Sequence, residues 1–309
     1  MTQLAFIGVS TGQSAATRLF PAWAKELGLG DVSLVGHDVP IHAPREIYRG
    51  LVERLKGDEH ERGALITTHK IDLFEACRDL FDRIDENAQL CGESSCLSKR
   101  EGLLWARATD PISAGRSLRE FLPEDHWRKT SGEVLCLGAG GSAIAITVHL
   151  IKLAAAAQGP ARITVVNRSE ARLQSMRAIH ARLNSALNID YIENVDPRVN
   201  DELVRSLPPA SLVINATGMG KDTPGSPITD AAMFPAGGLV WELNYRGELP
   251  FLRQALIQSA GRRLQVHDGW RYFIHGWAAV IEEVFDMEIS EERIARIATL
   301  SEGERPART

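Results

Sequence analysis

Six small residues lie between an apolar segment and a long helical one in the second half of the chain. The segment Val134–Leu137 is followed by Gly138, Ala139, Gly140, Gly141, Ser142 and Ala143. This spacing fits G-x-G-x-x-[GA]: the first glycine permits a tight turn, the second lets the backbone approach a pyrophosphate, and the third small residue lets strand and helix pack closely. The helix N-terminus would face the phosphates. The pattern predicts a dinucleotide site; the alternative is a glycine-rich turn without a ligand.

The end of the next predicted strand indicates which dinucleotide would bind. Ile163–Val166 is followed by Asn167, Arg168 and Ser169, with Arg172 one helical turn further. A site that prefers NAD normally carries Asp or Glu here for the ribose 2′-hydroxyl, whereas cationic and hydroxyl side chains suit a 2′-phosphate. We therefore expect NADP as the cofactor, with NAD as the second choice. The alternative is that Arg168 is a solvated residue at the start of a helix.

Two charged residues in the first half of the chain could carry proton transfer. Lys70 ends the segment Thr67-Thr-His-Lys70, and Asp110 lies in Ala108-Thr109-Asp110-Pro111. When hydride is added to a ketone, the oxygen gains alkoxide character, and a lysine ammonium both stabilises this charge and supplies the proton. A carboxylate can pair with the lysine and orient a substrate hydroxyl. Taken singly, each residue is better explained by a structural role, Lys70 as a solvated lysine at the start of a helix and Asp110 as a helix N-cap.

Four motifs together resemble the shikimate/quinate dehydrogenase family, and the resemblance covers nearly the whole chain. They are Thr67-Thr-His-Lys70, the turn at Gly138, the strand end Asn167-Arg168-Ser169, and Asn215-Ala216-Thr217-Gly218-Met219. The resemblance implies that Lys70 is the acid and base of a hydride transfer and that Asp110 is its orienting partner. It implies that residues 215–219 and Gly269 line the cofactor. It also implies a substrate of the shikimate or quinate type, a cyclic hydroxy acid whose ring ketone and alcohol are interconverted.

The segments that would contact the substrate depart from the family pattern. The usual H-S-x-S-P is here Gln13-Ser14-Ala15-Ala16-Thr17, so the second serine is replaced by Ala16. The usual A-x-N-T-L is Glu93-Ser94-Ser95-Cys96-Leu97, and a histidine stands near the C-terminus where glutamine is usual. Because carboxylate and hydroxyl contacts are changed, we expect weak activity on shikimate itself. The substrate contacts that the resemblance implies are Ser14, Thr67, Ser95, Tyr245 and His275.

Predicted strands and helices alternate along the chain, which places these motifs in an α/β protein with parallel sheets. The predicted strands are Leu4–Val9, Val32–Val39, Ala64–Thr68, Gln89–Ser98, Leu103–Thr109, Val134–Leu137, Ile163–Val166, Leu212–Asn215, Leu239–Leu243 and Leu264–Val266. The helices between them include Ala15–Leu27, Arg45–Lys56, Ile71–Phe81 and Ile112–Phe121. We expect two α/β domains, the second a Rossmann-type doubly wound parallel sheet. Residues 1–114 and 269–309 would form the substrate-binding catalytic domain, and residues 115–268 the NADP-binding Rossmann domain.

Composition excludes several other classes of protein. The 309 residues carry a formal net charge of −5, without the basic cluster typical of nucleic-acid binding. No apolar run reaches the roughly 20 residues of a membrane span, and we expect a cytoplasmic protein. The four cysteines suggest reduced thiols, and no histidine spacing indicates a metal. We expect a small-molecule substrate and a monomer or homodimer. The alternatives are a nucleotide-binding regulatory or sensor protein without turnover, and a reductase of another small metabolite.

Overall fold

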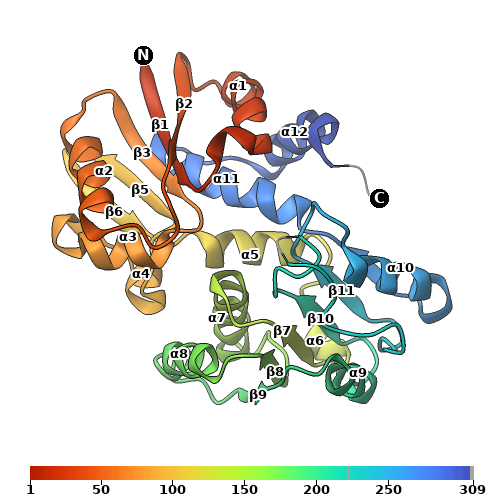
Figure 1. Cartoon of the computed structure of the whole chain (residues 1–309). Coiled ribbons are helices and arrows are strands. Elements are labelled where there is room, and N and C mark those ends of the chain that lie inside the picture. The colour runs from red at the N-terminus through yellow and green to blue at the C-terminus, as the bar shows by residue number, and fades with distance from the viewer. Residues whose placement is uncertain (222, 307–309) are drawn as a thin grey trace. The chain divides into compact units, whose positions relative to one another are not determined.

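The computed structural model describes residues 1–221 and 223–306, which form two compact units (Figure 1). The first unit comprises Met1–Ser113 and Ile274–Arg305, and the second comprises Ala114–Phe273. The chain passes from one unit to the other within helices α5 (Asp110–Arg119) and α11 (Trp270–Phe285). Each unit contains a six-stranded sheet with helices on both faces. The α/β fold expected from the alternating pattern is therefore confirmed.

The sheet of the first unit mixes parallel and antiparallel neighbours in the order β2-β1-β3-β5-β6-β4. β1 pairs in parallel with β2 and β3, whereas β5 is antiparallel to both β3 and β6. The strands are β1 (Thr2–Gly8), β2 (Val32–Asp38), β3 (Glu61–Ile66), β4 (Arg83–Ile84), β5 (Cys96–Arg100) and β6 (Leu103–Arg107). The helices wholly within this unit are α1 (Ala15–Leu27), α2 (Arg45–Gly57), α3 (Lys70–Cys77), α4 (Glu86–Cys91) and α12 (Glu291–Ser301), with 3₁₀ turns at Thr11–Gln13, Arg78–Leu80 and Glu302–Glu304.

Alternating side chains of β1 supply two cores, as the period of two of a strand requires. Ala5 and Ile7 belong to the cluster formed with α2 and α3. On the other face, the Phe6 ring lies 5.1 Å from the Trp277 ring of α11, which also contacts Trp23 of α1. The sheet is thus buried on both sides, and its strand ends are held in place by helices of both layers.

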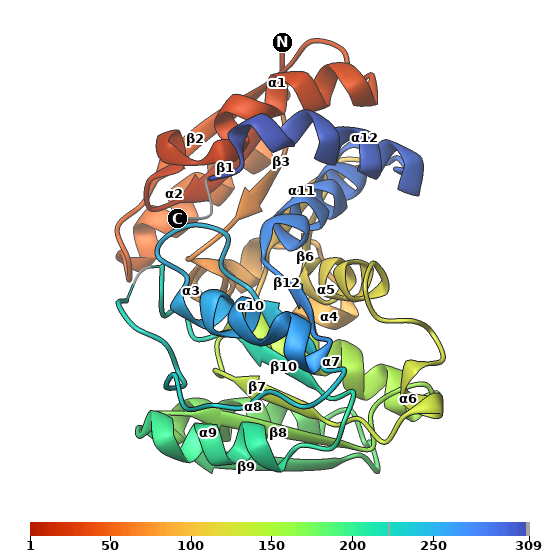
Figure 2. The same ribbon diagram turned by 90° about the vertical axis from the view of Figure 1, so that its right-hand side faces the viewer.

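The sheet of the second unit is parallel throughout, in the order β12-β11-β10-β7-β8-β9. Figure 2 shows β10, β7, β8 and β9 side by side. The strand order is that of a dinucleotide-binding doubly wound sheet, in which ligands bind at the carboxyl ends of the strands where the winding reverses, here between β7 and β10. The strands are β7 (Val134–Leu137), β8 (Arg162–Asn167), β9 (Asn188–Glu193), β10 (Leu212–Asn215), β11 (Leu239–Glu242) and β12 (Gln265–His267). The further helices are α6 (His126–Lys129), α7 (Gly141–Ala155), α8 (Glu170–Ala181), α9 (Pro197–Ser206) and α10 (Pro250–Arg262).

One prediction of local structure is wrong, and one strand of the second sheet was not predicted. The first part of the strand predicted at Gln89–Ser98 belongs to α4, and the strand begins only at Cys96. The Asp85 side chain accepts a hydrogen bond from the Ala88 amide at 2.6 Å, and Gly92 ends the helix in the left-handed conformation. These caps decide in favour of a helix over the apolar run. Strand β9 was not predicted, because its residues are only half-buried and carry little apolar pattern. In the described ranges, no helix has the length and apolar character needed to cross a membrane.

Candidate functional site

The structure pairs Lys70 with Asp110, which lie 40 positions apart in the sequence. Lys70 is the first residue of α3, just after β3, and Asp110 is the first residue of α5, just after β6. The Lys70 ammonium donates a hydrogen bond to Oδ2 of Asp110. The two side chains are 22% and 13% exposed, so the ion pair is largely shielded from water yet accessible to a small ligand. The dyad that the resemblance implies thus exists as a contact.

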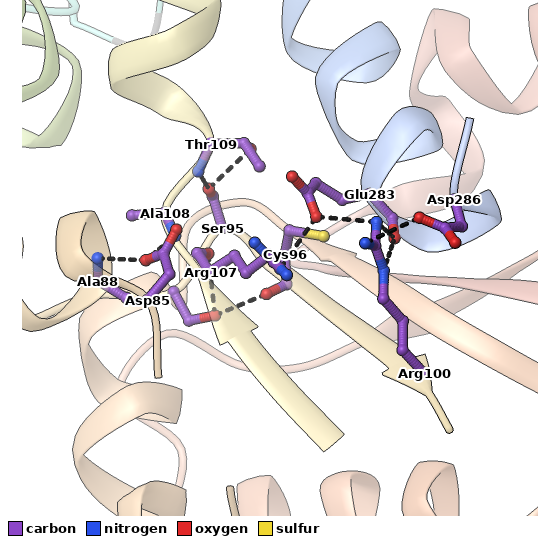
Figure 3. A network of polar contacts seen from close by, with 11 residues as sticks. Asp85, Ala88, Ser95, Cys96, Arg100, Arg107, Ala108, Thr109, Glu283 and Asp286 are labelled. Carbon is purple, nitrogen blue, oxygen red and sulfur yellow. Dashed lines mark hydrogen bonds and ion pairs between the residues drawn. The ribbon is translucent and has the colours of Figure 1, made fainter. Parts of the chain in front are cut away.

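Ser95 holds the segment that leads into Asp110. Its hydroxyl oxygen accepts a hydrogen bond from the Thr109 amide at 2.8 Å and lies 3.1 Å from the Thr109 hydroxyl (Figure 3). Ser95 is only 2% exposed. Its hydroxyl is therefore engaged with the residue that precedes Asp110, and its expected contact with the substrate stays a prediction.

Burial and neighbouring charge shift the pKa values of Lys70 and of a second carboxylate beside it, Glu93. Burial lowers the pKa of the Lys70 amine. The carboxylates of Asp110 and Glu93 together raise it by more than burial lowers it, so the pKa of Lys70 lies above its ordinary value. Sequence reasoning missed Glu93 as a member of this cluster. Burial raises the pKa of Glu93 to about 7, although Lys70 opposes the shift. The signal that could have revealed it was a charged residue in place of the family's alanine.

The other expected substrate contacts have separate surroundings. The Ser14 hydroxyl caps α1 by accepting from the Ala16 amide at 3.3 Å, and the Thr67 hydroxyl donates to the Ile7 carbonyl at 3.3 Å. Both follow the carboxyl ends of β1 and β3, the sheet edge that also carries Lys70. His275 is a buried residue of α11 in the first unit. Tyr245 belongs to the second unit, where its ring lies 5.3 Å from that of Trp270.

A pocket of about 550 Å³ lies in the second unit, at the carboxyl ends of β7, β8 and β10. It collects most of the residues that the sequence assigned to the cofactor: Gly138, Ala139, Gly140, Asn167, Arg168, Ser169, Arg172, Ala216, Thr217 and Met219. Sequence reasoning missed further lining residues between β9 and the first turn of α9 and on the loop after β10. These are Asn194, Val195, Pro197, Asn200, Thr223, Ser226 and Pro227.

The glycine-rich turn has the geometry that a pyrophosphate needs. Gly138 has φ of +117°, and a Cβ there would lie 2.5 Å from the Ala216 carbonyl oxygen, so only glycine fits. A Cβ on Gly140 would instead meet open space. The first amide of α7 with a partner one turn back is that of Ile144, which donates to the Gly140 carbonyl. The amides of Gly141, Ser142 and Ala143 precede it and suit an anion at the helix N-terminus.

The expected 2′-phosphate site contains two available cations. Arg168 and Arg172 are exposed at the start of α8 and line the pocket. Within residues 1–221 and 223–306, neither has a carboxylate partner. The Glu170 amide is occupied, because it donates to the Glu193 carboxylate at 3.2 Å. An anion at this end of the pocket would therefore be bound mainly by the two guanidinium groups.

A buried carboxylate organises the loop 215–219. Glu242, which is fully buried at the end of β11, accepts hydrogen bonds from the Asn215 side chain at 2.6 Å and from the Asn244 amide at 2.8 Å. Asn215 in turn accepts from the Thr217 amide and hydroxyl. Burial raises the pKa of Glu242 to about 7. Asn215 does not line the pocket, but it holds Thr217, which does.

Of the other residues that the sequence assigned to the cofactor, those outside the pocket lining are Gly141, Ser142, Ala143, Gly218 and Gly269. A Cβ on Gly269 would lie 1.8 Å from the Leu243 carbonyl oxygen, so glycine is required there by close backbone packing. We infer that Gly269 supports the loop after β11, and its expected contact with the cofactor stays a prediction.

Comparison with known proteins gives the family of the chain. It is 32% identical over 209 residues to the shikimate dehydrogenase (NADP(+)) of Symbiobacterium thermophilum, an alignment that covers 64% of this chain and 67% of that one. Shikimate 5-dehydrogenase from Thermus thermophilus, solved with NADP(H) and shikimate, has a TM-score of 0.73 at 22% identity and covers 97% of this chain and 100% of its own. 5-Ketofructose reductase of a Gluconobacter species has a TM-score of 0.73 at 21% identity, covering 96% and 98%. No protein-family model matches the chain.

A doubly wound sheet with a dinucleotide turn is the fold of a dinucleotide-binding α/β protein. The chain belongs to the shikimate/quinate dehydrogenase family, as its sequence resemblance implied, and it is an oxidoreductase that acts on a CH–OH group.

Proposed function

We propose that this protein is an NADP-dependent dehydrogenase that interconverts a ring alcohol and ketone of a shikimate- or quinate-like polyhydroxylated compound. The observation that carries the proposal is the shielded Lys70–Asp110 ion pair in a chain that also has a dinucleotide pocket. The names of the curated relatives, shikimate dehydrogenase (NADP(+)), support both the reaction class and the cofactor.

Lys70 is assigned the proton transfer. When bound in the pocket, the oxidised cofactor NADP⁺ would supply the hydride acceptor for oxidation of the alcohol, and NADPH would supply the hydride donor for reduction of the ketone. During reduction, the Lys70 ammonium gives its proton to the carbonyl oxygen as negative charge develops there; during oxidation, the neutral amine takes the hydroxyl proton. Because the pKa of Lys70 is raised, the protonated form dominates near neutral pH and suits reduction. Oxidation should therefore accelerate as pH rises.

Asp110 is assigned the orientation of both partners. One carboxylate oxygen accepts from Lys70, which leaves the other free to accept from a substrate hydroxyl next to the reacting carbon. Fixing the hydroxyl and the ammonium on one carboxylate places the reacting oxygen beside the proton donor.

The pocket of the second unit is assigned to NADP. The turn at Gly138 and the amides at the start of α7 would hold the pyrophosphate, and Arg168 and Arg172 would bind the 2′-phosphate. These roles fit the groups present: a cradle open at Gly140 and two cations without carboxylate partners in the described chain.

The test is a spectrophotometric assay with NADP⁺ and a panel of ring hydroxy compounds, comparing wild type with Lys70→Ala. We expect turnover on the best substrate to fall by roughly 10²–10⁴-fold, the usual contribution of a general acid–base group. NADP⁺ affinity should change by less than about twofold, since Lys70 is not part of the nucleotide pocket. Lys56→Ala is the matched control, because Lys56 is an exposed lysine of the same unit that pairs with Asp82.

Near-normal turnover in Lys70→Ala would refute the assigned mechanism. NADP⁺ binding without turnover on any compound of the panel would instead favour a nucleotide-binding protein without catalysis.

A further inference from the structure

A second carboxylate lies beside the Lys70–Asp110 pair and has no role in the mechanism above. Glu93 is 4% exposed, and no hydrogen bond within the described chain holds its carboxylate. Its loop is fixed, because the Ser94 amide donates to the Lys70 carbonyl at 3.1 Å and the Ser95 amide donates to the Arg107 carbonyl at 3.0 Å. An acceptor on a nearly buried side chain that has no protein donor is available to a donor that a ligand supplies.

The charges around Glu93 do not balance. The titratable groups that face it are the Lys70 ammonium on α3 and the Asp110 carboxylate on α5, and the Cys91 thiol faces Lys70 from the end of α4. Lys70 is already paired with Asp110. When Glu93 is ionised, the cluster therefore carries one uncompensated negative charge in a shielded place.

An independent feature at the same sheet edge concerns the binding of a carboxylate. Ala16, which stands where the family has a serine, is fully buried and offers no donor. The Ser14 hydroxyl is already engaged with the Ala16 amide. The first unit has thus lost a donor for a substrate carboxylate and gained a carboxylate of its own.

We propose that Glu93 is a specificity-determining residue that selects a neutral polyhydroxylated ring substrate, by accepting a hydrogen bond from a substrate hydroxyl, and disfavours one that carries a carboxylate. This rests on the proposed function, which it narrows from shikimate- and quinate-like compounds to those without the acid group. The loop of Glu93 is hydrogen-bonded to the backbone of Lys70, to which the proton transfer is assigned, so the Glu93 carboxylate is placed to meet a substrate that Lys70 contacts. A second negative charge within one ring diameter is repelled strongly in a shielded site.

The test compares shikimate with its methyl ester, two probes that share every hydroxyl and differ in the charge of the acid group. With NADP⁺, each loses hydride from the reacting carbon and a proton from its hydroxyl. For wild type at pH 8.5, we expect kcat/KM to be about tenfold or more higher for the ester. The ratio should fall toward pH 6, because Glu93 takes up a proton near pH 7 and its charge disappears.

Two variants of Glu93 isolate the effect. In Glu93→Gln and Glu93→Ala, the ratio of ester to acid should fall by about tenfold and lose its pH dependence around pH 7. Glu61→Gln is the matched control, since Glu61 is a buried glutamate of β3 whose pKa is also raised by burial, but which lies near Arg54 instead of Lys70. A wild-type preference for shikimate at pH 8.5, or a ratio unchanged in both Glu93 variants, would overturn the inference.

A binding readout separates this inference from the proposed function. In protein labelled with [5-¹³C]glutamate, the carboxyl resonance absent from Glu93→Gln should titrate near pH 7 and shift more with the methyl ester than with shikimate. If neither probe is oxidised although NADP⁺ binds, the proposed function fails. The shift of the Glu93 resonance then tests by itself whether Glu93 discriminates between the two probes. Equal shifts with both probes would then overturn the role of Glu93.

Discussion

The solvent exposure of Arg168 and Arg172 sets the loss of NADP⁺ affinity that we expect when Arg168 is removed. Arg168 and Arg172 both line the pocket and are exposed, without carboxylate partners in the described chain. A hydrogen bond to a charged group contributes about 1.5–3 kcal/mol, and exposure to solvent argues for the lower limit. Since about 1.4 kcal/mol corresponds to a factor of ten, Arg168→Ala should weaken NADP⁺ binding by about tenfold. NAD⁺ lacks the phosphate and should bind almost unchanged.

The assay is a titration of wild type and variant with both cofactors, followed by fluorescence or calorimetry, at two ionic strengths. The wild-type preference for NADP⁺ should be about tenfold or more and should fall with salt, because screening acts over about 8–10 Å. Arg177→Ala is the control on the same helix: its guanidinium lies over the Tyr191 ring, 4.8 Å from the centroid, and it does not line the pocket.

Two results would refute this reasoning. Equal affinity of wild type for NADP⁺ and NAD⁺ would show that Arg168 is a solvated residue at the start of a helix and does not bind the 2′-phosphate. An equal loss of both cofactors in Arg168→Ala would show that the side chain supports the fold of the pocket and does not read the phosphate.

Two further predictions concern the second unit. Gly138→Ala should lower stability and abolish NADP⁺ binding, because its Cβ would lie 2.5 Å from the Ala216 carbonyl oxygen at a φ of +117°; Gly140→Ala, whose Cβ meets open space, should keep the melting temperature and weaken only NADP⁺ binding. Equal melting temperatures for the two variants would contradict the geometry. Because burial raises the pKa of Glu242 to about 7, ionisation should cost the folded unit up to about 3 kcal/mol as pH rises from about 4.5 to about 7. Glu242→Gln should remove this pH dependence. The free energy of unfolding, measured in urea, should therefore change in favour of the variant relative to wild type between pH 5 and pH 8. A difference between variant and wild type that does not change with pH would contradict the prediction.

The sequence pattern was sufficient to predict a structural element wherever the residues that determine that element are neighbours in the chain. The helix Ala15–Leu27 was predicted with the bounds that the structure shows, since the apolar period and the following Gly28 define it. The turn at Gly138 was recognised for the same reason: strand, glycines and helix are contiguous, and their physical requirements are local. The family and the α/β architecture followed from several such segments taken together.

Tertiary structure decided which side chains meet. The contacts of Ser95 with Thr109 and the electrostatic coupling of Glu93 to Lys70 and Asp110 join segments 14 to 23 positions apart, and no periodicity encodes them. A one-dimensional pattern records the type of each residue, but the pKa and the role of a carboxylate depend on burial and on the charges brought near it by the fold. For this reason the sequence identified the dyad and the cofactor turn, whereas the buried Glu93 and the backbone-engaged Ser95 became visible only in three dimensions.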